Sequence, residues 1–228
     1  MDVTTEVDQG PTIDDEGDVA RDSDDDYIVL PWWQNPINII SMLLGVLLLA
    51  AGAGFVIGER HEAVHPTTSD IGFMQDMRAH HEQAVEMSII YISKNDTNAV
   101  TETIAREIAF GQAVEIGKMI QLLRDYGKPE ANESGTAMTW MGEPTPLDRM
   151  PGLATEADVQ SLIDAKGSAA DKIFLTLMIA HHQGGLHMLD KAVKTTGTSE
   201  MNLLIKGMIS GQQSEIAEMT GLLAKLPK

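Results

Sequence analysis

Two copies of one polar pattern occur in this chain of 228 residues, which contains no cysteine. Each copy places two adjacent histidines on an apolar stripe and a Gln-x-x-Glu pattern about thirty residues further on. The residues are His80, His81, Gln112 and Glu115 in the first copy, and His181, His182, Gln212 and Glu215 in the second. Imidazole and carboxylate groups are common metal ligands, so a metal held by both copies is one interpretation.

The second interpretation is purely structural. A buried carboxylate costs several kcal/mol unless a partner compensates its charge. Glu115 and Glu215, if they face a core, therefore need either a histidine or a metal ion as partner. Histidine–glutamate pairs alone would form a buried polar network that fixes the register of the helices. The repetition of the whole pattern favours metal binding over this network.

A methionine one turn before each histidine pair narrows the choice of metal. Met77 and Met178 precede His80 and His181 at the position where di-iron bundles have a glutamate. Thioether sulfur and imidazole together suit Cu(I), and His with Glu could hold Cu(II), whereas zinc and iron are less favoured. The predicted metal ligands are His80, His81, His181, His182, Met77, Met178, Glu115 and Glu215. Core packing is the expected role of Met74, Met87, Met119, Met188 and Met219.

The elements that must position these residues follow from the same repeat. Residues 70–81 match residues 171–182, and residues 111–123 match residues 211–223. Apolar residues recur every three or four positions in both halves, which is the period of an α-helix. Helices are therefore predicted over about residues 70–93, 98–126, 169–195 and 199–225. Two such hairpins bury their apolar stripes by packing together, which predicts an all-α four-helix bundle.

The start of the chain differs in composition. Residues 1–36 hold eleven acids and one base, which predicts an acidic disordered tail. Residues 37–58 are uncharged and long enough to cross a bilayer as one transmembrane helix, with Trp32 and Trp33 at the interface. Ala51-Gly52-Ala53 resembles a signal-peptide cleavage site, but the long acidic leading region favours a retained anchor. The flanking basic residues do not fix the orientation.

The remainder divides into a linker and the bundle. Residues 59–69 are a juxtamembrane linker, and residues 70–228 form the bundle, interrupted by a crossover over residues 127–168. The crossover is rich in Gly and Pro at first, and Thr155 with Asp158 predicts the capped start of a short helix.

Composition and missing motifs exclude several functions. The formal charge of −18 argues against nucleic-acid binding, and the absence of cysteine excludes thiol catalysis and disulfides. No nucleophile elbow or phosphate-binding loop is present, so the sequence favours a protein that is not an enzyme. The expected partners are the lipid bilayer, through residues 37–58, and a membrane protein; the sequence does not give the oligomeric state.

Residues 67–226 resemble the domain-of-unknown-function 305 family. The resemblance rests on Phe73-x-x-x-Met77-x-x-His80-His81-x-x-Ala84, on Gln112-x-x-Glu115-Ile116-x-x-Met119, on their second copies and on Met150-Pro-Gly. It implies a ferritin-like bundle that is often exported or membrane-anchored, and some similar proteins are extracytoplasmic copper binders linked to copper resistance. Three positions depart from the pattern. Leu153 stands where a second Met often follows Met-Pro-Gly, which removes one possible thioether. Gly185 replaces the usual Ala, which predicts looser packing, and His187 is an additional histidine expected at the surface.

Together these observations favour a membrane-anchored, extracytoplasmic bundle that binds copper for sequestration or handover. The alternative is a structural or docking module of a membrane complex, in which the His–Glu network holds no metal.

Overall fold

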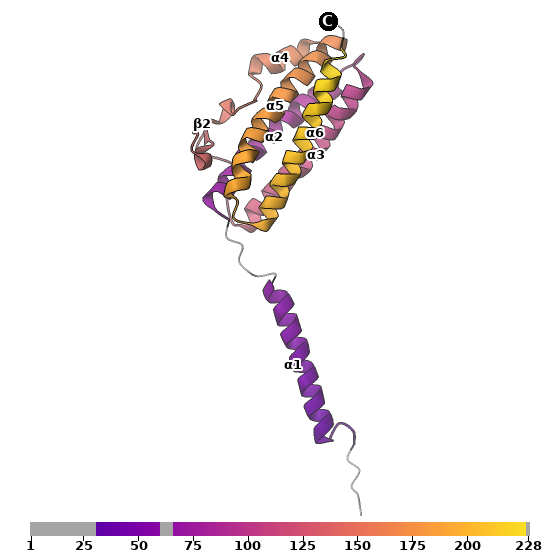
Figure 1. Ribbon diagram of the computed structural model, residues 1–228, viewed down its shortest axis with the longest axis vertical. Coiled ribbons are helices and arrows are strands. Elements are labelled where there is room, and N and C mark those ends of the chain that lie inside the picture. The colour runs from indigo at the N-terminus through magenta and orange to yellow at the C-terminus, as the bar shows by residue number, and fades with distance from the viewer. Residues whose placement is uncertain (1–30, 60–65, 227–228) are drawn as a thin grey trace, which may run out of the picture. The chain divides into compact units, whose positions relative to one another are not determined.

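The computed structural model describes residues 31–59 and 66–226, which fall into two compact units divided after residue 62. Most of the predicted tail, residues 1–30, and residues 60–65 of the predicted linker lie outside the described residues. The elements are α1 (Pro36–Glu59), α2 (Thr68–Ile92), α3 (Ala99–Asp125), β1 (Thr136–Ala137), η1 (Thr139–Met141), β2 (Thr145–Pro146), η2 (Leu147–Arg149), α4 (Glu156–Asp164), α5 (Gly167–Thr195) and α6 (Ser199–Leu223) (Figure 1).

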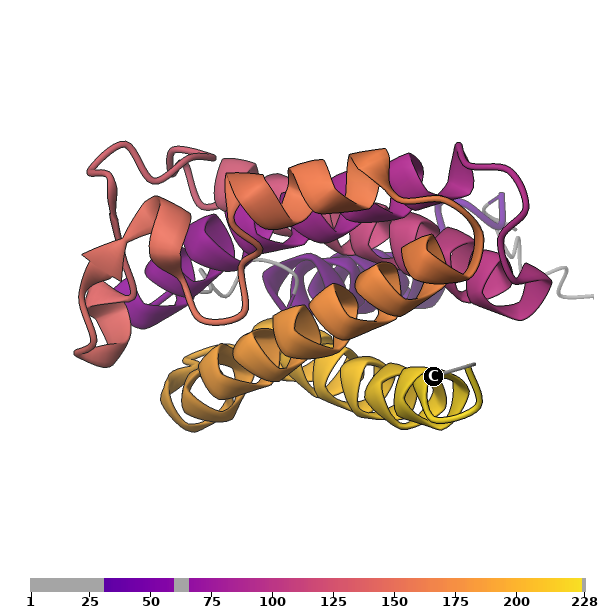
Figure 2. The same ribbon diagram turned by 90° about the horizontal axis from the view of Figure 1, so that it is seen from above.

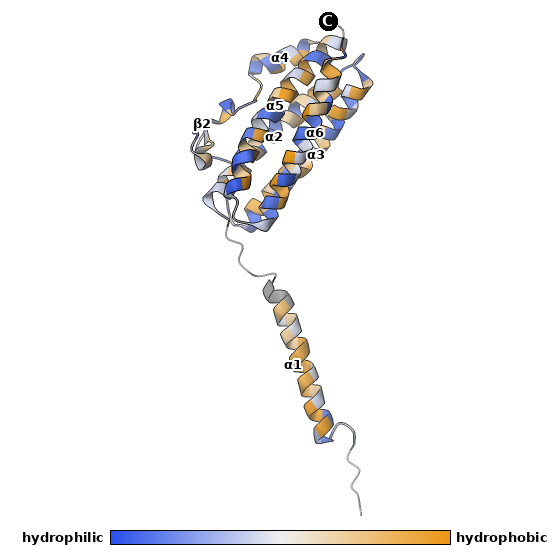
Figure 3. Cartoon of the chain, viewed as in Figure 1, coloured by the Kyte–Doolittle hydropathy of each residue, from blue (hydrophilic) through white to orange (hydrophobic). Residues whose placement is uncertain are grey.

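The first unit contains α1, a helix of 24 residues. Within it, Pro36–Phe55 is long and apolar enough to cross a membrane, and none of this stretch is buried against other parts of the chain. Figure 3 shows apolar residues along most of the helix, without the polar face that marks a helix packed on a soluble core. The helix thus covers the run of residues 37–58 that the sequence singled out.

The second unit is a bundle of four long helices, as predicted. The ends of α2, α3, α5 and α6 lie within two residues of the predicted bounds. Local chemistry accounts for three of the starts. Thr67 and Asp70 form a capping box at the start of α2. The side chains of Asn98 and Thr198 accept hydrogen bonds from backbone N–H groups at the starts of α3 and α6.

The two halves of the bundle are related by an approximate two-fold axis. Asp70, near the start of α2, accepts a hydrogen bond from the backbone of Gly197 in the turn before α6, at 3.1 Å. Its repeat equivalent Asp171, near the start of α5, accepts one from the backbone of Asn98 before α3, at 3.0 Å. Each hairpin therefore begins against the turn of the other, so α2 and α5 lie side by side and antiparallel. Figure 2 shows the α5–α6 pair as one layer across the α2–α3 pair.

The core is unusually rich in methionine. In the larger of its two clusters, nine of sixteen buried residues are methionine, and Met77 is one of them. Met178 lies in the second cluster. The five methionines expected to serve as core packing, Met74, Met87, Met119, Met188 and Met219, are all fully buried. Their flexible side chains fill the irregular space between crossing helices.

The crossover is more ordered than its composition indicated. The short helix α4 begins at the predicted capping box of Thr155 and Asp158. The two-residue strands β1 and β2 were not predicted, because two residues are too short to show an alternating pattern. A buried carboxylate holds this part in place: Asp76 accepts hydrogen bonds from the Met138 backbone at 2.7 Å, the Trp140 indole at 3.0 Å and the Asn132 amide at 2.7 Å.

Candidate metal centre

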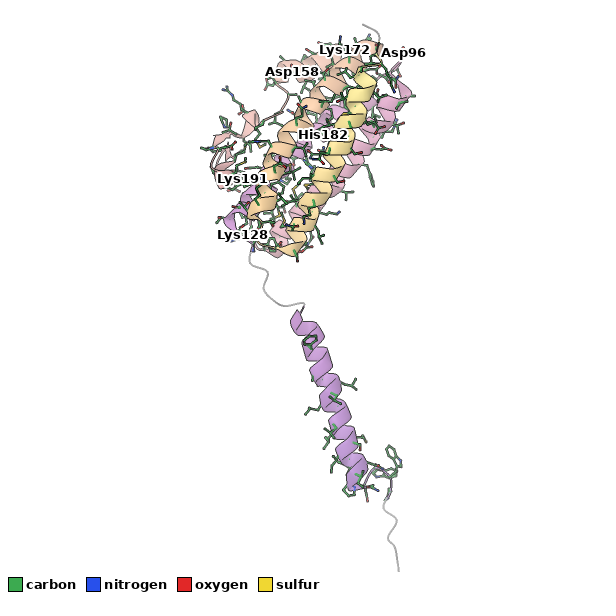
Figure 4. The ribbon with its side chains drawn as sticks, in the orientation of Figure 1. Asp96, Lys128, Asp158, Lys172, His182 and Lys191 are labelled. Carbon is green, nitrogen blue, oxygen red and sulfur yellow. The ribbon has the colours of Figure 1, made fainter. Side chains whose placement is uncertain are left out.

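The two histidine pairs meet where α2 and α5 cross. His80 and His181 lie against each other with ring centroids 3.9 Å apart and ring planes tilted by 36°. Both pairs are buried, with exposures of 0–1%. Figure 4 shows His182 about midway along the bundle, between α5 and α6. The prediction that both pairs enter one core is therefore confirmed.

Every one of the four imidazoles is held through its Nε2 atom. His80 Nε2 lies 3.0 Å from the carbonyl oxygen of Pro151, and His181 Nε2 lies 2.9 Å from that of His80. His81 Nε2 lies 2.9 Å from Glu115, and His182 Nε2 lies 2.7 Å from Glu215. A carbonyl oxygen or a carboxylate accepts hydrogen bonds and does not donate them, so the proton of each ring is on Nε2.

In the neutral form of each ring, this arrangement leaves a lone pair on the other nitrogen. Among the described residues, the Nδ1 atoms of His80, His81, His181 and His182 are buried without a hydrogen-bond partner. An unpaired buried acceptor costs about 1–3 kcal/mol, and four of them in one core require an explanation. Metal-binding histidines have the same arrangement, with one nitrogen on the metal and the other donating to a carbonyl or carboxylate. The histidines therefore fit a bound metal.

Burial keeps the two inner rings neutral. It lowers the pKa of His80 to about 3, chiefly because the charged form loses its hydration, and the neighbouring His81 adds to the effect. The pKa of His181 is also well below its usual value, for the same reason and because of the adjacent His80. At neutral pH both lone pairs are therefore free of protons, as metal ligation requires.

The eight predicted ligands do not form one shell around a single point. Among the described residues, no three His, Asp or Glu side chains are placed to hold one ion together. Met77 and Met178 are fully buried one turn before the histidine pairs. The structure thus brings the four histidines and two methionines into the core, while the two glutamates contact the rings from one side.

The expectation that Glu115 and Glu215 are core residues needs correction. Their side chains remain 24% and 31% exposed, whereas Gln112 and Gln212, one turn earlier, are 4% exposed. The carboxylates therefore lie at the edge of each hairpin, where water still solvates them, and they reach inward to a buried imidazole. Burial of the carboxylate is not the reason for the pairing.

A strap formed by Met150–Ala154 covers the inner histidines, and sequence reasoning missed its role. Its Pro151 carbonyl oxygen accepts a hydrogen bond from His80 Nε2. A side chain at Gly184 of α5 would place its Cβ only 1.9 Å from that same carbonyl oxygen, and one at Gly152 would lie 2.4 Å from the Ala180 carbonyl oxygen. Two glycines, one on each surface, thus permit contact between backbones. The Met150-Pro-Gly motif was the available signal.

The predicted loosening at Gly185 is wrong. Gly185 is buried, and a Cβ there would come within 2.5 Å of the Gln212 side-chain oxygen. The missing methyl group is therefore replaced by the amide of Gln212, and the two helices pack closely. His187, as expected, is exposed; it pairs with Glu143 at 2.8 Å.

Comparison with known proteins finds a family and solved structures that are similar to this bundle. The family model described as "Domain of unknown function (DUF305)" matches residues 70–223. A DUF305 protein from Streptomyces coelicolor, described as secreted, is 38% identical over 69% of this chain and 91% of its own, with a TM-score of 0.63. A DUF305 fragment from Deinococcus radiodurans is 28% identical over 71% and 99%, with a TM-score of 0.61.

A third solved structure contains a metal. CopM in the Cu(I)-bound form is 26% identical over 67% of this chain and 94% of its own, with a TM-score of 0.50. The comparison with curated proteins gave no match.

Proposed function

The chain belongs to the DUF305 family, and we propose that it is a membrane-anchored protein whose bundle binds copper outside the cytoplasm, for sequestration or handover. The observation that carries the proposal is the set of four buried Nδ1 lone pairs on rings whose Nε2 protons are already engaged. The similarity to a protein solved with Cu(I) supports copper as the cargo.

The histidines, methionines and glutamates have different roles in holding the ion. The Nδ1 atoms of the four histidines would bind copper, and the buried sulfur atoms of Met77 and Met178 supply soft donors one turn away. Glu115 and Glu215 orient His81 and His182 by accepting hydrogen bonds from their Nε2–H groups. Copper supplies no chemistry in this proposal beyond being bound and released.

The alternative is a structural or docking module in a membrane complex. In that case the His–Glu contacts would fix the helix register and nothing more. The four Nδ1 atoms without a hydrogen-bond partner argue against this alternative. A network selected only for packing would give both nitrogens of each ring a hydrogen bond, or would have apolar residues in place of the rings.

Copper binding by purified full-length protein, kept in detergent, tests the proposal. The parent should retain Cu(I) after equilibrium dialysis and gain thermal stability from it, because a ligand of the native state stabilises that state. The variant H81Q/H182Q should remain folded and lose both properties. The matched control is H187Q, which changes an exposed histidine and should behave as the parent. Parent-like copper binding by a folded H81Q/H182Q would make the histidines structural.

The anchor is tested separately. The apolar helix α1 should keep the protein in the membrane fraction at alkaline pH, with residues 37–58 present in the intact mass. A mature N-terminus near Gly54 would instead mean a cleaved signal sequence. Because the chain has no cysteine, K128C on the exposed Lys128 provides a unique label. A membrane-impermeant maleimide should label it in intact spheroplasts if the bundle is extracytoplasmic.

A further inference from the structure

The inner histidines are too close together to share one ion across the two-fold axis. The centroids of His80 and His181 are 3.9 Å apart. With metal–nitrogen bonds of about 2.0 Å, an ion bound to both Nδ1 atoms would have an angle of only about 75° between its directions to the two rings. Both tetrahedral and straight coordination require a much wider angle. A single ion bridging the halves through these two rings is therefore disfavoured.

Within each half the spacing is different. Two imidazoles on opposite sides of one ion have ring centroids about 6 Å apart at the same bond length. The centroids of His181 and His182 are 6.0 Å apart, and those of His80 and His81 are 6.5 Å apart. Both separations are therefore compatible with one ion between the two rings of a pair, once the rings turn to direct their Nδ1 atoms at it.

Ligand number and charge both favour a monovalent ion. No three His, Asp or Glu side chains of the described residues are grouped for one ion, whereas monovalent ions with a filled d shell accept two nitrogen ligands in a line. The sulfur atoms of Met77 and Met178 are soft donors of the kind such ions prefer. One carboxylate contacts each pair, Glu115 at His81 and Glu215 at His182. Each pair thus has one nearby carboxylate, which matches a single positive charge better than a double one.

We propose that each half of the bundle binds its own monovalent ion, copper(I) in function, between the Nδ1 atoms of its adjacent histidines, so that one chain carries two ions. This inference rests on the proposed copper-binding function and adds the number of ions, their oxidation state and their separation into two half-sites.

Silver(I) is a suitable probe, because it is monovalent, has a filled d shell and does not change oxidation state in air. Full-length protein in detergent is dialysed against excess silver(I), and bound ions are counted by native mass spectrometry. Two ions per chain are expected for the parent and for the surface control H187Q. H81Q and H182Q should each retain one, and H81Q/H182Q none. Circular dichroism establishes that each variant is folded.

Each other outcome has a distinct meaning. One ion in the parent, lost completely from either single variant, would mean one shared site and would overturn this inference while leaving the proposed function in place. No silver and no copper in the parent would overturn both. Zinc(II) retained at two per chain as tightly as silver would overturn the assignment to monovalent ions. The ion count of the parent alone decides the matter if a variant fails to fold.

Discussion

The two halves of the bundle share their candidate ligands but differ in what surrounds them. Each half has a Met-x-x-His-His segment and a glutamate in contact with the second histidine, at 2.9 Å in the first half and 2.7 Å in the second. The contacts next to these residues are different. Asp76 of the first half, which anchors the crossover through three hydrogen bonds, corresponds to Leu177 in the second.

The strap over the inner histidines shows the same asymmetry. On α2, Gln83 exchanges two hydrogen bonds with the backbone of Ala154. On α5 the equivalent residue is Gly184, where the strap backbone takes the place of a side chain. The strap is thus held by side-chain hydrogen bonds on α2 and by close backbone contact on α5. The residues that contact the crossover and the strap differ between the halves, whereas the histidines are the same, so these contacts do not account for the histidines. The proposed metal binding, common to both halves, would account for them.

The largest effect is expected where the second half receives the strap. G184A should lower the free energy of unfolding by about 3 kcal/mol or more, because its Cβ would overlap the Pro151 backbone, which cannot move without breaking the His80 contact. The adjacent variant G185A is the control. Its Cβ meets only the end of the Gln212 side chain, which can turn away. Denaturant unfolding that gives equal losses for both variants would contradict the strap contact.

The pH dependence of the metal-free protein tests whether the inner histidines of both halves are buried and neutral. Unfolded histidine has a pKa of ~6.5, whereas His80 in the fold has a pKa of about 3. As the pH falls below 6.5, the unfolded chain takes up the proton first, so stability present at pH 7 is lost progressively toward pH 3. Because of the lowered pKa of His80, the free energy of unfolding should be about 2 kcal/mol smaller at pH 5 than at pH 7. The lowered pKa of His181 should add a loss of the same sign. A flat profile between pH 7 and pH 5 would show that the rings are not buried and neutral.

The anchor of the first half should have a moderate effect. D76N places an amide where three donors converge, so about 2 kcal/mol of stability should be lost through a mismatched buried polar group. The exposed Asp190 gives the matched control, D190N. Metal binding should be unchanged in both, since neither residue contacts a histidine ring. A loss of bound metal in folded D76N would link the crossover anchor to the site.

The smallest effect is expected at the first-half contact with the strap. Q83A removes two hydrogen bonds to Ala154, but the backbone groups there are partly exposed and can bond to water. The expected loss is about 1 kcal/mol by thermal or denaturant unfolding. A loss as large as that of G184A would mean that the two halves hold the strap equally firmly.

The sequence predicted the helices well because their apolar period is a local property repeated twice. It predicted less well how deep each polar residue lies. Glu115 and Gln112 share one stripe, but only the packed helices decide which is at its centre and which at its edge. Asp76 lies on the same stripe as Phe73 and His80, so the sequence already places an acid at a core position.

The position of the strap could not be predicted from local sequence patterns. Its contact joins Gly152 and Gly184, which lie on different elements, and no helical or strand period connects them. The positive φ of Gly152, 82°, also depends on the path of the crossover between the halves. Motif residues in a loop therefore gave the only indication that the segment approaches the histidines.

The tautomer of the four histidines is the point on which the metal proposal depends most directly. Long-range proton–nitrogen NMR spectra of the imidazoles, recorded before and after addition of silver(I), observe Nδ1 and Nε2 separately. The four buried rings should carry their proton on Nε2 in both states, and their Nδ1 resonances alone should shift on metal addition. If the Nδ1 atoms prove protonated, or if only the exposed His187 responds to silver, the buried histidines are not the metal ligands.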